Sequence, residues 1–295
     1  MRLGAAPTAV VAVVAMAAVV VAATPAAAGP NDIELLGLVD RTDPAAPVVR
    51  NEDFRSLVRE LGLIFTPSGL QPAETTGIAG FDFAVDYAFH VVNLDRPYWQ
   101  DALEERGGRV PMTIGARARK GFILPVPLAS EVEVGAQWLI ESQMFNVGGN
   151  IRVALNEGFT GAHWWAFIPD VAVQAGFNRV VGSDDLELLT ATAGGTISKG
   201  FGLFGMVNLC PFAGYQSVFV NGSTRLVDTN PQMPNNVDDN VVFDIVRLTD
   251  NRIDRYSVGA RLVVAHIQLS GGVDISVLSP DDVIYQPAFR AGVSF

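Results

Sequence analysis

The sequence has few cysteines and histidines, the residues that form disulfides and bind metal ions. It contains one cysteine, Cys210, and three histidines in 295 residues. A single cysteine excludes an internal disulfide and a cysteine-based metal cluster. The sequence also lacks a Walker loop, a dinucleotide fingerprint and a His-x-x-x-His zinc spacing. We therefore expect no cofactor and no bound metal.

Positive charge and charge in general are also scarce. Lys and Arg number 20 against 31 Asp and Glu, which gives a formal net charge of −11. Such an acidic chain is a poor match for nucleic acid or for a basic membrane-surface patch. Only 17% of the residues are charged and 49% are hydrophobic. This composition would be explained if one face of every strand met lipid.

Long apolar runs are confined to the first 28 residues. Arg2 precedes an Ala/Val run, and small residues follow at Ala26 and Ala28. This order is typical of a secretory signal cleaved after Ala28; an uncleaved helical anchor is the alternative. Past residue 29 nothing approaches the ~18–20 apolar residues of a membrane helix.

Residues 29–76 are expected to form a linker and one amphipathic helix. The helix is predicted over 51–64, with Asn51 as N-cap and Gly62 near its end. One apolar stripe at the helical spacing i, i+3, i+4, i+7 is formed by Phe54, Leu57, Val58 and Leu61. The helix could pack inside the barrel mouth described below or lie on its periplasmic rim.

Beyond residue 76 the pattern changes to strict alternation, as in "GFDFAVDYAFHVV" at 80–92. Alternation predicts strands with one apolar and one polar face. The faces of 186–198 and 205–220 are ambiguous, and redrawing 158–205 would give twelve strands instead of ten. The ten predicted strands are 77–91, 109–119, 131–141, 147–156, 171–178, 186–198, 205–220, 255–264, 268–277 and 283–295.

Strand length and number favour an antiparallel, up-and-down transmembrane β-barrel over 77–295. Strands of about ten residues suffice to cross a bilayer when tilted. Loops 92–108 and 221–250 are long, and both fall outside if the chain ends are periplasmic. Loop 158–168 does not fit this pattern, because the same arrangement places it on the periplasmic side, where short turns are expected. A soluble barrel with reversed faces is the competing interpretation.

Aromatic residues support the membrane interpretation. Four of them lie on apolar faces near the outer ends of predicted strands, where amphipathic rings are stable at a membrane interface. This predicted girdle consists of Tyr87, Trp138, Tyr256 and Tyr285.

The final segment, "VIYQPAFRAGVSF", alternates apolar residues up to a terminal Phe295. It resembles the last strand of bacterial outer-membrane β-barrels, in which such a strand is an assembly signal. The resemblance implies outer-membrane lipid and the barrel-assembly machinery as partners, and the outer membrane as the location. The residues that match are Tyr285, Phe289, Ala291, Val293 and Phe295.

Polar residues on the opposite strand faces are predicted to line the lumen. An antiparallel pairing of the first two strands would bring Asp82 near Arg119 and Ala84 near Arg117, which predicts a ladder of salt bridges. The predicted lumen residues are Asp82, Asp86, His90, Arg117, Arg119, Glu131, Glu133, Glu141, Arg152, Arg261 and Arg290.

None of the candidate catalytic or metal-binding groups has a convincing spacing. Residues four apart in a strand lie ~13 Å apart, so Asp82, Asp86 and His90 cannot form a hydrogen-bonded dyad with one another. His266 lies in a predicted periplasmic turn, and Ser270 follows four residues later, in the next predicted strand. Loop 221–240 offers oxygen ligands of the kind that calcium prefers, but no twelve-residue calcium loop is present. Those oxygen ligands are Asp228, Asp238 and Asp239.

The sequence thus predicts a signal-bearing outer-membrane barrel that is a narrow porin-like channel or a structural barrel. A surface-binding barrel acting through loops 92–108 and 221–250 is the alternative, and a rim hydrolase is a weaker one. A barrel near ten strands is largely filled by its own side chains, which argues against a wide pore.

Overall fold

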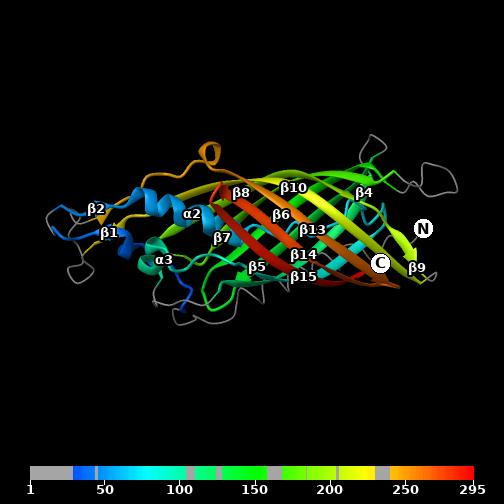
Figure 1. Ribbon diagram of the computed structural model, residues 1–295, viewed down its shortest axis with the longest axis horizontal. Coiled ribbons are helices and arrows are strands. Elements are labelled where there is room, and N and C mark those ends of the chain that lie inside the picture. Colours follow the sequence, from blue (N-terminus) through cyan, green and yellow to red (C-terminus); the bar gives the residue numbers. More distant parts are fainter. Residues whose placement is uncertain are drawn as a thin grey trace, which may run out of the picture.

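The computed structural model describes residues 29–43, 46–103, 110–123, 128–157, 168–183, 185–203, 206–229 and 240–295. The predicted signal segment, 1–28, lies outside these residues. Most of the described chain forms one antiparallel sheet that closes on itself (Figure 1).

Ten long strands make up the barrel, as the alternation predicts. Each pairs with its sequence neighbour in the ring, and β15 closes the ring onto β3. Phe295 and Phe81 exchange main-chain hydrogen bonds at this seam. A three-residue strand, β9 (Phe201–Leu203), pairs only with β10. The ten strands are β3 (Phe81–Phe89), β4 (Met112–Ile123), β5 (Ala129–Leu139), β6 (Phe145–Asn156), β7 (Asp170–Val181), β8 (Leu186–Ser198), β10 (Val207–Thr224), β13 (Arg252–Val264), β14 (Ile267–Ser279) and β15 (Asp282–Ser294).

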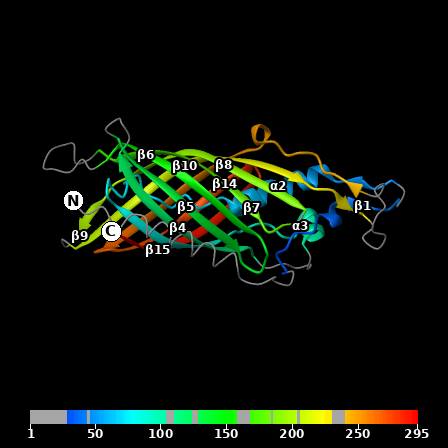
Figure 2. The ribbon, with the colours of Figure 1, turned by 180° about the vertical axis from the view of Figure 1, so that it is seen from behind.

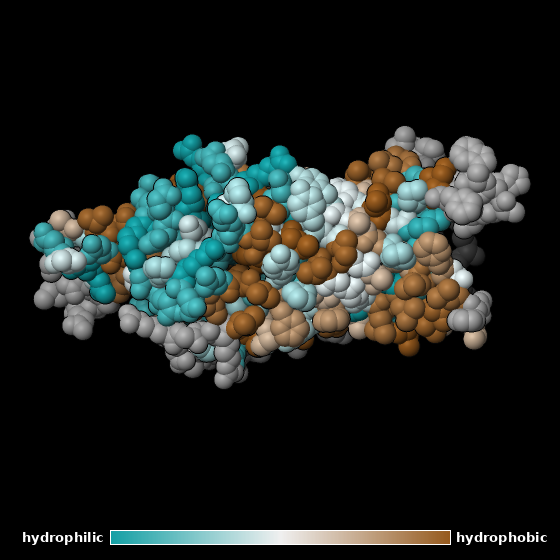
Figure 3. Space-filling view, viewed as in Figure 1, coloured by the Kyte–Doolittle hydropathy of each residue, from teal (hydrophilic) through white to brown (hydrophobic). Residues whose placement is uncertain are grey.

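Side chains alternate between the two faces of each strand. On β3, Asp82 and Asp86 are buried inside the barrel whereas Val85 points outward and is 41% exposed. Apolar residues cover much of the outer barrel surface, and polar residues gather at the end that carries the N-terminal helix (Figure 3). Outward-facing examples from other strands are Ile151, Phe177, Val258, Leu269 and Phe289.

The two strands with ambiguous sequence patterns have a simple explanation. β8 and β10 carry apolar side chains on the inner face near one end, including Leu188, Val218 and Val220, all at most 1% exposed. These residues belong to a core that contains the N-terminal helix. Alternation is lost there because both faces of the strand meet apolar surroundings.

The N-terminal region lies at the barrel end where β3 finishes and β10 reaches Thr224. It contains a 3₁₀ helix (Leu35–Leu38), the hairpin β1 (Val39–Asp40) and β2 (Val48–Val49), and helix α2 (Asn51–Phe65). Helix α3 (Pro97–Ala102), from the loop after β3, packs beside α2. The C-terminus lies at the opposite end (Figures 1 and 2). We call the ends the loop end and the C-terminal end.

Helix α2 occupies the mouth of the barrel at the loop end. The predicted helix is confirmed, and of the two predicted positions it takes the one inside the barrel mouth and not one lying on a rim. Glycines permit its close approach to β10: a Cβ at Gly62 would lie 2.6 Å from Val220, and one at Gly222 would lie 2.5 Å from Val58. In the described residues, no helix is long and apolar enough to cross a membrane.

After α2 the chain enters the barrel as an extended segment of residues 66–76, "TPSGLQPAETT", which we call the lumen segment. Pro67 and Pro72 disfavour helix at the residues before them. Eleven residues span at most roughly 36 Å when fully extended, and a turn in which the Gln71 N–H donates to the Gly69 carbonyl at 2.7 Å shortens this segment. The segment connects α2 at the loop end with β3, which begins at the C-terminal end.

The apolar outer face predicts contact with lipid. Val85→Arg places a charge in the middle of β3 on that face and is expected to destabilise the barrel by about 2–4 kcal/mol. Urea-induced unfolding in lipid vesicles measures the change, with Val85→Leu as the control. An unchanged unfolding midpoint would mean that the outer face does not meet hydrocarbon.

Candidate functional site

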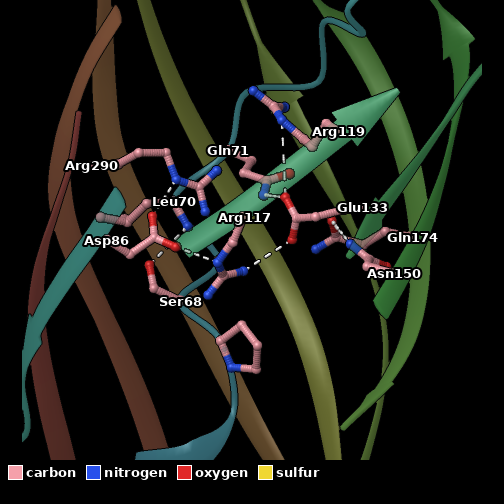
Figure 4. A network of polar contacts seen from close by, with 12 residues as sticks. Ser68, Leu70, Gln71, Asp86, Arg117, Arg119, Glu133, Asn150, Gln174 and Arg290 are labelled. Carbon is pink, nitrogen blue, oxygen red and sulfur yellow. Dashed lines mark hydrogen bonds and ion pairs between the residues drawn. The ribbon is translucent and has the colours of Figure 1, made fainter. Parts of the chain in front are cut away.

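The inner wall of β15, β3, β4, β5 and β6 carries a connected set of charges, which we call the lumen network. It contains four arginines and four carboxylates, so its formal charges cancel. Arg117 stands between Asp86 and Glu133 at its centre (Figure 4). The members are Asp82, Asp86, Arg117, Arg119, Glu131, Glu133, Arg152 and Arg290, each at most 7% exposed.

Neighbouring strands bring these charges together. The predicted pairing of the first two strands is confirmed: Asp82 lies opposite Arg119, at 3.1 Å between Oδ1 and Nε, and Ala84 lies opposite Arg117. Arg290 reaches Asp86 from β15 at 2.5 Å. Arg119 and Arg152 both approach Glu131, each at 3.4 Å. The predicted salt-bridge ladder therefore continues over five strands.

The lumen segment is held mainly through its main chain. The guanidinium of Arg255, which is fully buried, donates to the carbonyl oxygens of Thr66 and Pro67 at 3.3 and 2.6 Å. Arg152 donates to that of Pro72 at 2.8 Å. Main-chain N–H groups of the segment in turn donate to wall side chains: Gly69 to Asp274 at 3.0 Å, Ala73 to Ser198 at 2.9 Å, Thr75 to Glu157 at 2.9 Å and Thr76 to Glu131 at 3.2 Å.

Three side chains of the segment also bind the wall. Gln71 donates to Glu133 of the lumen network, the Thr75 hydroxyl donates to Glu157 at 2.8 Å, and Arg261 donates to Glu74. Glu74 therefore provides a carboxylate partner for the wall arginine from within the segment. The segment and the network form one hydrogen-bonded structure.

The barrel wall caps the C-terminal end of α2. The last carbonyl groups of a helix have no intrahelical donor. Here Gln286 donates to Leu63, Gln137 to Ile64 and Asn146 to Phe65, at 3.2, 3.2 and 2.5 Å. These three amides come from three strands of the inner wall, so the end of α2 is fixed at one depth in the barrel.

Little space remains beside the lumen segment. A cavity of about 40 Å³ lies against the polar wall of β5–β8, and one of about 10 Å³ lies near His90 and Asp86. One water molecule needs roughly 10–15 Å³ of cavity volume, so the larger cavity can hold a few waters. In the described residues the lumen is closed to anything larger.

At the loop end, helices α2 and α3 and the residues after β12 (Asn240–Val241) form a folded cap, which we call the loop-end module. We define it as 29–43, 46–65, 90–103 and 240–251. Its apolar core includes Phe54, Trp99 and Phe243, and the rings of Phe54 and Phe243 lie 4.8 Å apart.

One buried carboxylate fastens this module together. Glu60, 1% exposed, accepts hydrogen bonds from Tyr98 at 2.5 Å, Trp99 at 2.6 Å and Arg96 at 2.8 Å. Arg96 also binds Asp282 at the start of β15. Burial raises the pKa of the Glu60 carboxyl above its ordinary value of 4.5, although its hydrogen bonds act in the opposite direction.

The structure places the remaining predicted lumen residues as follows. His90 is buried just beyond β3 and contacts Thr113 and Gln286 at 2.9 and 2.7 Å. Arg261 faces the lumen segment through Glu74. Glu141 is a correction: β5 ends at Leu139, and Glu141 lies in the following turn with a φ of 62°. Turn geometry ends the alternation two residues earlier than the sequence suggests.

The predicted girdle and assembly residues lie on the outer surface. Trp138, Tyr256 and Tyr285 are 40–50% exposed, and Tyr87 is half-buried beside Phe89. Phe289 and Phe295 point outward on the last strand, with Phe295 71% exposed; Ala291 and Val293 lie on the same face.

The weaker candidates do not assemble into a catalytic or metal site. His266 lies in the turn at the C-terminal end, where it contacts the Ser294 carbonyl and stacks on Phe295. Ser270 points into the barrel. Asp238 and Asp239 lie outside the described residues; Asp228 is in β11 (Val227–Asp228). Within the part of the chain described, no three His, Cys, Asp or Glu side chains converge on a common point.

The sequence analysis missed the lumen segment and most of the wall residues that hold it. Gln137 and Asp274 are on faces predicted to be polar; Arg255 is the first residue of a predicted strand and is not among the predicted lumen residues. Two prolines five residues apart in a segment without helical or strand period were the available signal for an extended chain.

Comparisons with known proteins add the following. No protein-family model matches the sequence, and no curated protein matches it. Solved structures match in fold: LpxR from Salmonella typhimurium (10% identity, 72% of this chain and 99% of that chain, TM-score 0.36), Ail from Yersinia pestis (13%, 74% and 99%, 0.27) and the outer membrane protein Omp33 from Acinetobacter baumannii (12%, 73% and 99%, 0.28). The predicted β-barrel architecture itself is confirmed by the closed sheet.

The lumen network predicts a large penalty for an unpaired charge. Arg119→Ala leaves Asp82 without the only ion-pair partner it has among the described residues, and is expected to cost about 3–5 kcal/mol. Urea unfolding measures the loss, and Arg119→Ala combined with Asp82→Ala should recover part of it. The control is Arg252→Ala, which breaks an exposed pair with Asp254 and should leave stability unchanged.

Glu60 predicts a pH dependence of the loop-end module. Because its pKa is higher in the folded protein than the ordinary 4.5, folding favours the protonated form. The resulting stabilisation is fully present below pH 4.5 and is lost as the pH rises through the raised pKa. Glu60→Gln should remove this dependence. Protease resistance of the module across that pH window tests it, and identical profiles for the two proteins would contradict it.

Proposed function

We propose that this protein is a closed outer-membrane barrel that anchors the loop-end module on the outer surface, where the module binds a partner. One observation carries the proposal: the lumen segment fills the barrel from end to end and is bound by the wall at most of its residues. A barrel whose interior is occupied in this way is suited to anchoring and not to steady diffusion.

The loop-end module supports a surface role. It assembles residues from both long loops and the N-terminal region around an apolar core that continues into the barrel wall at Leu188, Val218 and Val220. Its surface is polar where the barrel surface is apolar (Figure 3). A module that projects from the barrel on a rigid base can present loops to a partner, whereas a simple channel would not need it.

The orientation follows from the same geometry. The apolar outer wall suits lipid, and the last strand carries outward Phe289 and Phe295, which suit recognition by the assembly machinery. With the C-terminus periplasmic, the long loops and the module face outward.

A narrow porin-like channel is the second candidate. The observation that favours it is the polar wall behind the lumen segment, which would form a hydrophilic path if the segment left. The charge balance of the lumen network would then give little preference for ions of either sign.

Conductance in planar bilayers separates the two candidates. The purified protein, shown to be folded by heat-dependent gel migration, is expected to be silent because the lumen segment fills the barrel. A variant without residues 30–70 should conduct, since α2 and half of the segment are gone. Steady conductance from the intact protein would overturn the closed barrel in favour of the channel.

A further inference from the structure

The two ends of the described chain lie on opposite sides of the barrel. Near the start, the Asn31 amide donates to Glu141 in a loop-end turn, and Asp32 accepts from Gln143 in the same turn. At the other end, Phe295 pairs with Phe81 where β3 begins. Ten strands alone would leave both ends on one side. The lumen segment is an eleventh crossing, and it puts residues 29–65 on the loop side.

The lumen takes one extended chain and no more. Leu70, Gln71 and Ala73 of the segment are at most 3% exposed, so the wall closes around them. The cavities beside the segment, about 40 and 10 Å³, hold only a few waters. A second strand of polypeptide running alongside the first, as in a hairpin, would not fit.

Most of the wall's contacts to the segment are made to main-chain groups, which every polypeptide has, and side chains of Gln71, Glu74 and Thr75 add three more. The wall's main-chain contacts to Thr66, Pro67 and Pro72 are made to carbonyl oxygens, and those to Gly69, Ala73, Thr75 and Thr76 to main-chain N–H groups. Main-chain hydrogen bonds give affinity for an extended peptide without demanding a sequence. The wall supplies donors for carbonyl oxygens mainly near the loop end and acceptors for N–H groups mainly near the C-terminal end. A different extended segment could be held in the same way.

From these three observations we propose that the barrel exports its own N-terminal region: residues 29–65, and polypeptide joined ahead of them, cross from the C-terminal side to the loop side through the lumen as a single extended chain. The lumen segment is the part that remains when the crossing ends. The loop-end module folds after its N-terminal part has arrived. The proposal goes beyond the proposed function, which concerns only the finished barrel.

Cysteine labelling on intact cells tests the side on which the N-terminal region lies. In a Cys210→Ala background, single variants Val48→Cys, Asp281→Cys and Ala265→Cys place thiols in exposed positions in β2, a loop-end turn and a C-terminal-end turn. A membrane-impermeant maleimide should label Val48→Cys and Asp281→Cys to the same extent. Ala265→Cys, at the opposite end of the barrel, should differ from both in its labelling. Val48→Cys behaving like Ala265→Cys would overturn the proposal.

A looped insertion tests the single-chain crossing. A flexible epitope-tagged stretch is inserted ahead of Gly29 in the same background, in one version with a pair of cysteines that closes a disulfide loop, and in a matched version with serines. A closed loop must cross as two chains side by side. The serine insert should therefore be detected on intact cells. The disulfide insert should give a signal at least several-fold weaker, and reductant added during expression should restore its signal.

Equal display of both inserts would overturn the extended-chain crossing, whatever the conductance. Channel activity of the intact protein would overturn the closed barrel and leave the labelling result unaffected. The two proposals therefore fail separately.

Discussion

The structure depends on one constraint: a polar group inside a closed barrel must find a partner inside it. Buried charges without partners cost several kcal/mol each, and unpaired main-chain groups cost less but are more numerous. The lumen network meets the constraint with four arginines and four carboxylates on five neighbouring strands. The opposite wall has mostly hydroxyls and amides, and it meets the constraint by binding the main chain of the lumen segment.

The same constraint explains why the inner wall changes character along its length. Near the C-terminal end it faces an extended chain with exposed N–H and C=O groups, and it is polar. Near the loop end it faces the side of α2, whose main chain is already satisfied, and it becomes apolar at Leu188, Val218 and Val220. The three amides that cap Leu63, Ile64 and Phe65 mark the boundary. The N-terminal region and the wall are therefore complementary over the whole barrel.

Alternation was sufficient to predict the ten strands, and the pairing of Asp82 with Arg119 followed from antiparallel register alone. Both depend on a period of two that each strand carries locally. The lumen segment has no such period, because its partners are distributed over the whole ring, from Arg152 on β6 to Arg255 on β13. The faces of β8 and β10 were ambiguous for a related reason: their inner neighbours come from a helix more than a hundred residues away in sequence. Contacts of this kind leave no local signal.

The lumen segment is a structural part of the barrel and not an independent plug. Arg255 is fully buried and donates to Thr66, Pro67 and Gln216, with no carboxylate in direct contact among the described residues. Without the segment, water would have to replace two of these acceptors. Asp274 would similarly lose the Gly69 amide. The wall thus carries groups that are satisfied only when a main chain crosses the lumen. Such a wall favours closure around an extended chain, and the contacts that shut the barrel are those that would hold a chain in transit.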